Sequence, residues 1–240
     1  MDAVVPRLAA TVMLVRDRGG LEVLMVERHD QVHFASALVF PGGGVDADDR
    51  APDWLTHVEG AGGLDETERA VRIAALRELF EETGLFVGAG QTPAAGPFHE
   101  AIAAAGARLD LATLVPFAHW ITPVGAPKRF DTHFRLCAAE GRGVAASDGR
   151  ETVSAEWIPP GEALRLGAAG ERKVIFPTRL NLELLAKAGS VDEAMAQARA
   201  RTIVTVTPWI EHRESGVHIV IPPDAGYGDV AEFAGPTTFR

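Results

Sequence analysis

The segment Arg77-Glu78-Leu79-Phe80-Glu81-Glu82-Thr83-Gly84-Leu85 combines residue types and spacings that could do chemistry. A helix has about 3.6 residues per turn, so Glu78, Glu81 and Glu82 would share one face. Like charges at these spacings repel, and a hard divalent cation with oxygen ligands would relieve that repulsion. Arg77 adjoins the three carboxylates and could hold one by a bidentate contact. The alternative is an acidic helix end that water alone solvates.

Two neighbouring features favour a metal or phosphate site over a solvated helix end. Carboxylates usually stabilise the N-terminal end of a helix, whereas these stand at the C-terminal end, just before Gly84. Upstream, Phe40-Pro41-Gly42-Gly43-Gly44 predicts a strand that ends in a loop, because proline lacks an N–H and consecutive glycines cost entropy in regular structure. Glycine lets backbone carbonyl or N–H groups approach a metal or phosphate closely.

The elements that must position these residues alternate between strands and helices, which predicts an α/β or α+β class. The main helix is expected over 65–83, with Asp65 and Glu68 as a capping box and Gly84 as its end. Residues 46–63 are expected to be irregular. Further strands are predicted at 8–15 and 21–27 as a hairpin, and at 37–40, 85–87, 117–122, 132–138 and 153–158. Further helices are predicted at 98–105, 109–114, 161–166, 178–186 and 191–199, and a final hairpin at 204–210 and 217–221.

Composition sets outer bounds on the function. The chain has 240 residues with 47% apolar and 23% charged residues, which suits one large domain or a domain with an extension. A formal net charge of -10 argues against a nucleic-acid partner, but not against a small phosphorylated substrate. The sequence predicts neither a signal peptide nor a membrane span, so a cytoplasmic location is expected. The single Cys137 is expected to be a buried, inert thiol.

The residues from 77 to 85 resemble the second half of the Nudix box, G-x5-E-x7-R-E-U-x-E-E-x-G-U with U aliphatic, at every defined position. Counting back from Arg77 places Arg69 where the pattern has Glu, and Gly63 on the leading Gly. The Pro41-Gly42-Gly43-Gly44 loop stands much further upstream. The box is therefore expected to contain an insertion, roughly over 46–62.

Other segments resemble, in order, the peroxisomal coenzyme A diphosphatase group of Nudix proteins and its bacterial relatives. They are Trp120-Ile121-Thr122-Pro123, Trp157-Ile158-Pro159-Pro160 and Ile219-Val220-Ile221-Pro222-Pro223-Asp224. The resemblance implies a single elaborated Nudix domain over 1–240, with a core over about 6–166 and an extension over about 167–240. It implies an α/β fold with a mixed β-sheet between helices (α/β/α), an insertion in the box and a C-terminal helical extension.

The resemblance also implies a mechanism, in which Mg²⁺ or Mn²⁺ assists water to attack a phosphorus of a nucleoside diphosphate derivative. Glu78, Glu81 and Glu82 would be the metal ligands, together with a backbone carbonyl for which Gly43 is the candidate. Glu78, Glu81 and Arg77 would form the catalytic group. A further carboxylate acting as base is expected from Glu151, or else from Glu156, although both could be ordinary surface acids.

Substrate contacts are expected from two basic regions and from the glycine loop. Arg28 follows the second strand, and Lys128 and Arg129 lie in the connection between strands 117–122 and 132–138, so all three could face a phosphate. Gly42, Gly43 and Gly44 would offer backbone groups. The alternatives are surface charge for Lys128 and a structural Arg129–Asp131 pair.

The eight histidines show no spacing typical of a zinc site. His29 and His33 stand four apart, but in a loop-like run. His119, His133 and His218 alternate with apolar residues, which favours strand positions at the surface or in the core.

Three functions remain open. The first is hydrolysis of coenzyme A or acyl-coenzyme A, and the second is hydrolysis of ADP-ribose, NADH or another nucleoside diphosphate derivative. The third is a non-catalytic Nudix-fold regulator that binds a nucleotide, against which the intact carboxylates count. The expected partner is a small nucleotide substrate, with no nucleic acid and no membrane, and a homodimer is compatible with the family.

Overall fold

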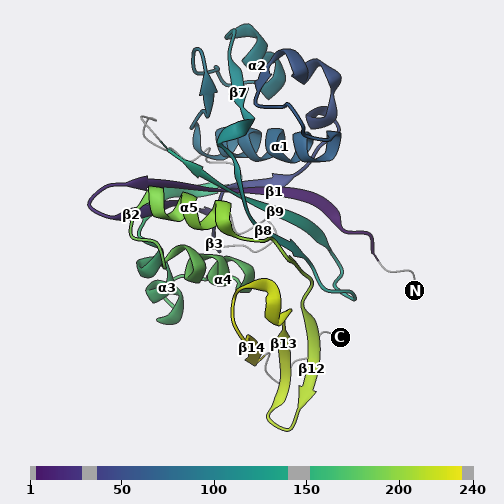
Figure 1. The fold of residues 1–240 in the computed structure, drawn as a ribbon, viewed down its shortest axis with the longest axis vertical. Coiled ribbons are helices and arrows are strands. Elements are labelled where there is room, and N and C mark those ends of the chain that lie inside the picture. Colours follow the sequence, from purple (N-terminus) through teal and green to yellow (C-terminus); the bar gives the residue numbers. More distant parts are fainter. Residues whose placement is uncertain (1–3, 29–36, 140–151, 234–240) are drawn as a thin grey trace.

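A mixed β-sheet forms the centre of the protein (Figure 1). The computed structural model describes residues 4–28, 37–139 and 152–233. β1 (Arg7–Asp17) runs antiparallel to β2 (Leu21–Arg28) and parallel to β9 (Phe130–Ala138). The strand order is β10-β2-β1-β9-β8-β11, with β3 paired to β2 and β4 to β1. The bounds are β3 Leu38–Val39, β4 Gly42–Gly44, β8 Val115–Ile121, β10 Thr152–Ile158 and β11 Thr205–Val206.

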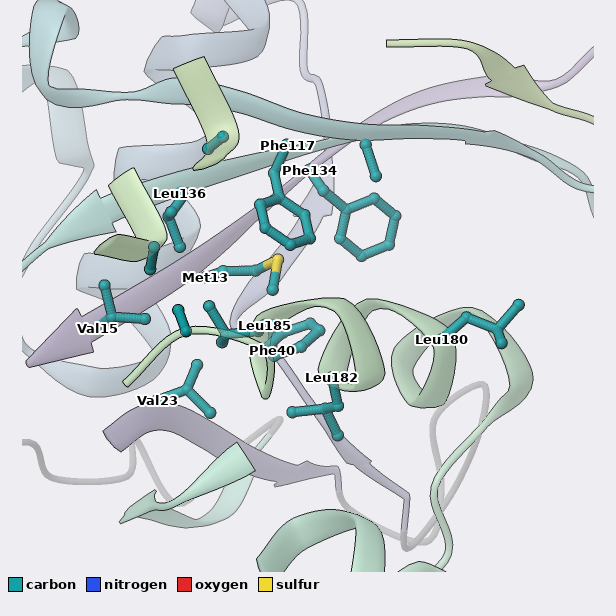
Figure 2. Packing of buried hydrophobic residues seen from close by; sticks show 14 of the residues in the cluster. Met13, Val15, Val23, Phe40, Phe117, Phe134, Leu136, Leu180, Leu182 and Leu185 are labelled. Carbon is teal, nitrogen blue, oxygen red and sulfur yellow. The ribbon is translucent and has the colours of Figure 1, made fainter. Parts of the chain in front are cut away.

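Helices cover both faces of this sheet, as Figure 1 shows, which confirms the predicted α/β/α layering. Alternate side chains of a strand point to opposite faces, so Val12 and Leu14 of β1 pack in one core, while Met13 and Val15 pack in the other. The first face carries α1 (Glu66–Thr83) and α2 (Phe98–Ala104). The second carries α3 (Pro160–Ala168), α4 (Phe176–Leu185) and α5 (Val191–Ala200). Figure 2 shows this second core, in which Met13 and Leu182 lie within one apolar cluster.

The helix that holds the acidic cluster begins and ends as predicted. Asp65 is the N-cap of α1, and its side chain accepts from the Glu68 N–H at 2.8 Å. Gly84 ends α1 in the left-handed region, with φ 70°. The other contact of the expected capping box, from the Asp65 N–H to the Glu68 carboxylate, was predicted wrongly. The Glu68 carboxylate instead accepts from Arg72 and from the buried Arg135 of β9, which needs a counter-charge.

The three consecutive glycines are a strand and not the predicted loop. Gly42–Gly44 forms β4, and Gly43 is the partner of Ala10 on β1. A Cβ at Gly42 would lie 2.4 Å from the Ala10 carbonyl oxygen and 2.7 Å from the Thr11 Cα. The absence of a side chain therefore allows the backbone of β4 to lie close enough to pair with β1.

The insertion before α1 is more regular than predicted. It contains two 3₁₀ turns, Asp48–Arg50 and Pro52–Thr56, followed by β5 (Val58–Glu59). Trp54 is buried, contacts Phe98 of α2 and donates from Nε1 to the Asp48 carbonyl at 2.9 Å. β5 joins a small sheet of order β5-β7-β6, with β6 at Gly88–Ala89 and β7 at Arg108–Asp110. The predicted helix over 109–114 is wrong, because β7 and a 3₁₀ turn over Leu111–Thr113 occupy it.

The C-terminal part divides between two sheets. Thr205–Val206, as β11, joins the central sheet beside β8, and the expected hairpin is formed by β12 (Trp209–Arg213) and β13 (Gly216–Val220). β14 (Ala231–Phe233) pairs with β13 and completes a small sheet at the end opposite α1 and α2 (Figure 1). The extension thus adds a sheet to the predicted helices. Within the described ranges, each helix is too short or too polar to cross a membrane.

Candidate active site

The guanidinium of Arg77 links the insertion, β4 and the acidic face of α1. Its Nε and Nη2 donate to the two carboxylate oxygens of Asp49, both at 3.0 Å. Its Nη1 donates to Glu78 Oε1 and to Glu81 Oε2, both at 2.9 Å, and Nη2 also reaches the Gly44 carbonyl at 2.9 Å. One side chain on α1 therefore orients two neighbouring carboxylates.

Electrostatics keep this guanidinium charged. Burial alone would lower the pKa of Arg77, but the hydrogen bond to Asp49 and the charges of Glu78, Asp49 and Glu81 outweigh burial and raise that pKa. The Asp49 side chain is itself only 1% exposed. The pair is thus a fixed cation and a fixed anion beneath the acidic helix face.

Glu82 attaches the end of α1 to the glycine strand. Its Oε2 accepts from the Gly42 N–H at 3.0 Å, and the residue is buried. The Glu78 side chain is 13% exposed, whereas that of Glu81 is 44% exposed. The three carboxylates therefore form a gradient from the protein interior to solvent, and Glu81 is the one that water and a substrate reach most easily.

The carboxylate of Glu78 lies directly over the bare Cα of Gly43. A Cβ at Gly43 would stand 2.3 Å from Glu78 Oε1 and 2.5 Å from Oε2. Carboxylates and backbone carbonyls are the ligands that Mg²⁺ and Mn²⁺ prefer. The donor set on α1 and β4 therefore fits a hard divalent cation, and the absence of a side chain at position 43 leaves the space that the Glu78 carboxylate occupies.

A methyl group at position 43 is expected to disturb this arrangement. Gly43 has a backbone that other residues can adopt, so Gly43→Ala should change stability little but should push the Glu78 carboxylate aside. Displacement of a catalytic group by about 1 Å can cost about 10²-fold in rate. Metal-activated hydrolysis and thermal unfolding would be compared with Gly62→Ala, whose added Cβ meets nothing within 4 Å. Equal activity of the two variants would refute the role of glycine at position 43.

Sequence reasoning missed Asp49, although a signal for it was present. The Nudix pattern begins G-x5-E, and counting forward from Gly43 places Asp49 at the acidic position. Counting back from Arg77 misses it, because the two residues are 28 positions apart along the chain. The insertion lies between Asp49 and Arg77, and the fold brings the two side chains back into contact.

The three basic residues predicted to contact phosphate have different surroundings in the structure. Arg129 donates to the carbonyls of Thr122 and Val4, at 2.9 and 2.8 Å, so its structural contacts are with backbone oxygens and not with Asp131. Lys128 is exposed at the same end of the sheet. Arg28 is the last residue of β2, and its side chain lies outside the described part.

The structure describes one of the two candidate bases, Glu156, whereas Glu151 lies outside the described residues. Glu156 on β10 is the cross-strand partner of Met25, which packs in the core on the face away from α1. Its carboxylate accepts from Arg172 at 3.0 Å, and Arg172 also pairs with Glu27. Glu156 thus belongs to an ion-pair group on the opposite face, and Glu151 stays the prediction for a further base.

A second polar group lies on the α1 side of the sheet, where His119 of β8 contacts Asp131 and His133 of β9. Burial, with the nearby His119 and Arg135, lowers the pKa of His133 to about 4. At pH 7 the His133 imidazole is therefore neutral. It contributes no positive charge for binding a phosphate.

An acidic C-terminal helix face, fixed by a buried Arg–Asp pair against a glycine strand in an α/β/α fold, defines a Nudix-type site. The NUDIX domain model matches residues 5–178, so the chain belongs to the Nudix family and is a Nudix hydrolase. This confirms the family expected from the segment at 77–85. The metal, catalytic and substrate roles of individual residues stay predictions.

The chain is similar to individual Nudix proteins over most of its length. The chain is 26% identical to acyl-coenzyme A diphosphatase NUDT19 of Gallus gallus, over 89% of this chain and 75% of the relative. It is 25% identical to the protein of the same name from Homo sapiens, over 89% of this chain and 74% of the relative. Among solved structures, a NUDIX hydrolase from Alicyclobacillus acidocaldarius superposes with a TM-score of 0.69 at 28% identity, covering 80% of this chain and 96% of that one.

Proposed function

We propose that this Nudix hydrolase cleaves the phosphoanhydride bond of coenzyme A or acyl-coenzyme A with Mg²⁺ or Mn²⁺. The hydrolytic site is inferred chiefly from the Arg77 guanidinium, which donates to both Glu78 and Glu81 and to the Gly44 carbonyl of β4. The substrate class rests on relatives named acyl-coenzyme A diphosphatase, which match most of the chain at low identity.

In this proposal Glu78, Glu81, Glu82 and the Gly43 carbonyl hold the cation. When bound, the cation neutralises the diphosphate and lowers the pKa of a coordinated water. The chain's own residues supply the geometry. Arg77 directs one oxygen each of Glu78 and Glu81 toward itself, which sets the orientation of their remaining oxygens.

Glu82 has a different proposed role from Glu78 and Glu81. Its hydrogen bond to the Gly42 N–H fixes the distance between the end of α1 and β4. Glu81, as the most exposed of the three, is the group placed to accept a proton from the attacking water. Glu151 is the proposed additional base.

Several of the residues predicted to contact phosphate already have partners in the described part of the structure. The Gly42 N–H donates to Glu82 and the Gly44 carbonyl accepts from Arg77, so these two backbone groups are occupied. Arg129 donates to two carbonyls. The proposal therefore gives the diphosphate to Lys128, which is exposed, and to Arg28, whose side chain lies outside the described part.

Product analysis by chromatography tests the substrate class. Coenzyme A, acetyl-coenzyme A, ADP-ribose and NADH would each be incubated with Mg²⁺ or Mn²⁺, and with a chelator as the control for metal dependence. The expected result is one adenosine 3',5'-bisphosphate and one phosphopantetheine product for each water consumed. If only ADP-ribose or NADH were cleaved, the proposed substrate class would be wrong and the proposed hydrolytic site would stand. Turnover of none of the four with either metal would favour the nucleotide-binding regulator.

A further inference from the structure

The cluster of His119, Asp131 and His133 brings three metal-ligand atoms together on strands β8 and β9. One atom from each side chain lies within 4.8 Å of the other two. His119 Nε2 is hydrogen-bonded to Asp131 Oδ1, and His133 Nε2 lies 3.6 Å from that same oxygen. The two imidazole rings are stacked, with centroids 4.1 Å apart.

The β8–β9 pairing creates this arrangement. His119 and His133 are directly opposite in the antiparallel register, and Asp131 stands two residues before His133 on the same face of β9. Phe134 and Trp120, the next residues along each strand, point into the core on the α4 side. The cluster therefore projects from the α1 side of the sheet. His133 is aligned through Ala10 of β1 with Gly43 of β4, two strands away.

The charges at the cluster leave its carboxylate without a strong cation. In the described ranges, the basic groups within ion-pair reach of Asp131 are the two imidazoles. The side chains of His119, Asp131 and His133 are 19%, 30% and 20% exposed, so an ion can reach ligands that are already partly desolvated. Asp131 would offset one of the two charges of a divalent cation there, and the cation would replace the hydrogen bond between Asp131 and His119.

The donor types differ from those of the acidic helix. Two imidazole nitrogens and one carboxylate oxygen suit Zn²⁺ and similar transition metals, whereas Mg²⁺ prefers oxygen ligands throughout. Thr205 Oγ1 lies 2.8 Å from His119 Nδ1, the outer contact that orients a metal-binding imidazole. Arg135 Nη2 is 3.5 Å from His133 Nδ1, which is too long for a strong hydrogen bond. This weak contact leaves His133 Nδ1 able to carry the proton that ligation through Nε2 requires.

We propose that His119, Asp131 and His133 form a second metal site, which binds a Zn²⁺-type transition-metal ion and leaves a fourth position open. Stacked rings cannot both direct a nitrogen lone pair at one ion, so at least one imidazole turns about its side-chain torsions on binding. The proposal does not rest on the hydrolytic reaction. It concerns ligands on the central sheet that are separate from the carboxylates of α1.

Co²⁺ binding to the metal-free full chain tests this site without measuring hydrolysis. Excess Mg²⁺ would occupy oxygen-only sites, and the visible ligand-field bands of Co²⁺ would report nitrogen ligation. We expect one Co²⁺ per chain, displaced by one Zn²⁺. His119→Ala and His133→Ala should abolish the bands, while His212→Ala, which removes an exposed imidazole on β12, should keep them. Thr205→Val should weaken binding by about 10–100-fold.

Several outcomes would overturn the proposal. They are an absence of bands in the unmodified chain, bands that persist in both histidine variants, or bands that are lost in Glu81→Gln, which would place Co²⁺ on α1. Circular dichroism would establish that each variant is folded. Asp131→Asn, which keeps the side-chain shape, provides a second test should either alanine variant fail to fold, and retention of full Co²⁺ affinity by this variant would equally refute the site.

Discussion

We expect Glu81→Gln to lower kcat by about 10²–10⁴-fold, the range that a positioned proton-transfer group contributes. Glutamine keeps the size of the side chain and one carbonyl oxygen, but it loses the negative charge. Glu81 is 44% exposed and its contact is with Arg77 on the preceding turn of α1, so the fold should tolerate the change. The measurement is steady-state hydrolysis at saturating substrate and saturating Mg²⁺ or Mn²⁺, with thermal unfolding measured in parallel.

The chain offers a closely matched control for this variant. Glu183 on α4 pairs with Arg179 at the same four-residue spacing, and its side chain is 43% exposed. Glu183→Gln removes the same kind of surface ion pair, which is worth about 0.3–0.5 kcal/mol. It should leave kcat unchanged. A similar loss of rate in both variants would mean that the effect of Glu81→Gln comes from helix stability and not from the site.

Asp49→Asn should destabilise the fold and reduce activity together. Asp49 is buried beneath Arg77, and loss of its charge leaves a mostly buried guanidinium without its principal counter-ion. Breaking such a pair costs about 3–5 kcal/mol. Asparagine can still accept one hydrogen bond, so about 3 kcal/mol is expected, or a fall in Tm of roughly 6–12 °C. At temperatures below the unfolding transition, activity should fall about 10–100-fold, as it does for other residues that hydrogen-bond to metal ligands without binding the metal.

Asp48→Asn is the control for this second prediction. Asp48 is the neighbouring residue of the same 3₁₀ turn, and it is exposed. Its carbonyl, which the substitution keeps, accepts the Trp54 contact. Chemical denaturation should therefore show a change within about 0.5 kcal/mol. If Asp49→Asn were equally mild, the Arg77–Asp49 pair would not be what holds the acidic face in place.

The sequence by itself determined the parts of the site that are local. Glu78, Glu81 and Glu82 share a helix face because their spacing matches the helical period. Asp65 and Gly84 limit α1 through contacts within a few residues of each end. The hairpin of β1 and β2 and the two strands β8 and β9 were also predicted, since alternating apolar residues between turns indicate such strands. These features depend on neighbours in the chain.

Only the tertiary structure decided the contacts between distant segments. The glycines at 42–44 form a strand because β1 offers them partners, which no local preference predicts. Asp49 reaches Arg77 because the insertion folds against α1, and spacing along the chain hides that contact. His119 and His133 looked like separate strand residues until the register of β8 and β9 placed them face to face. Pairing between strands and packing across an insertion join residues far apart in sequence, so their chemistry appears only once the chain has folded.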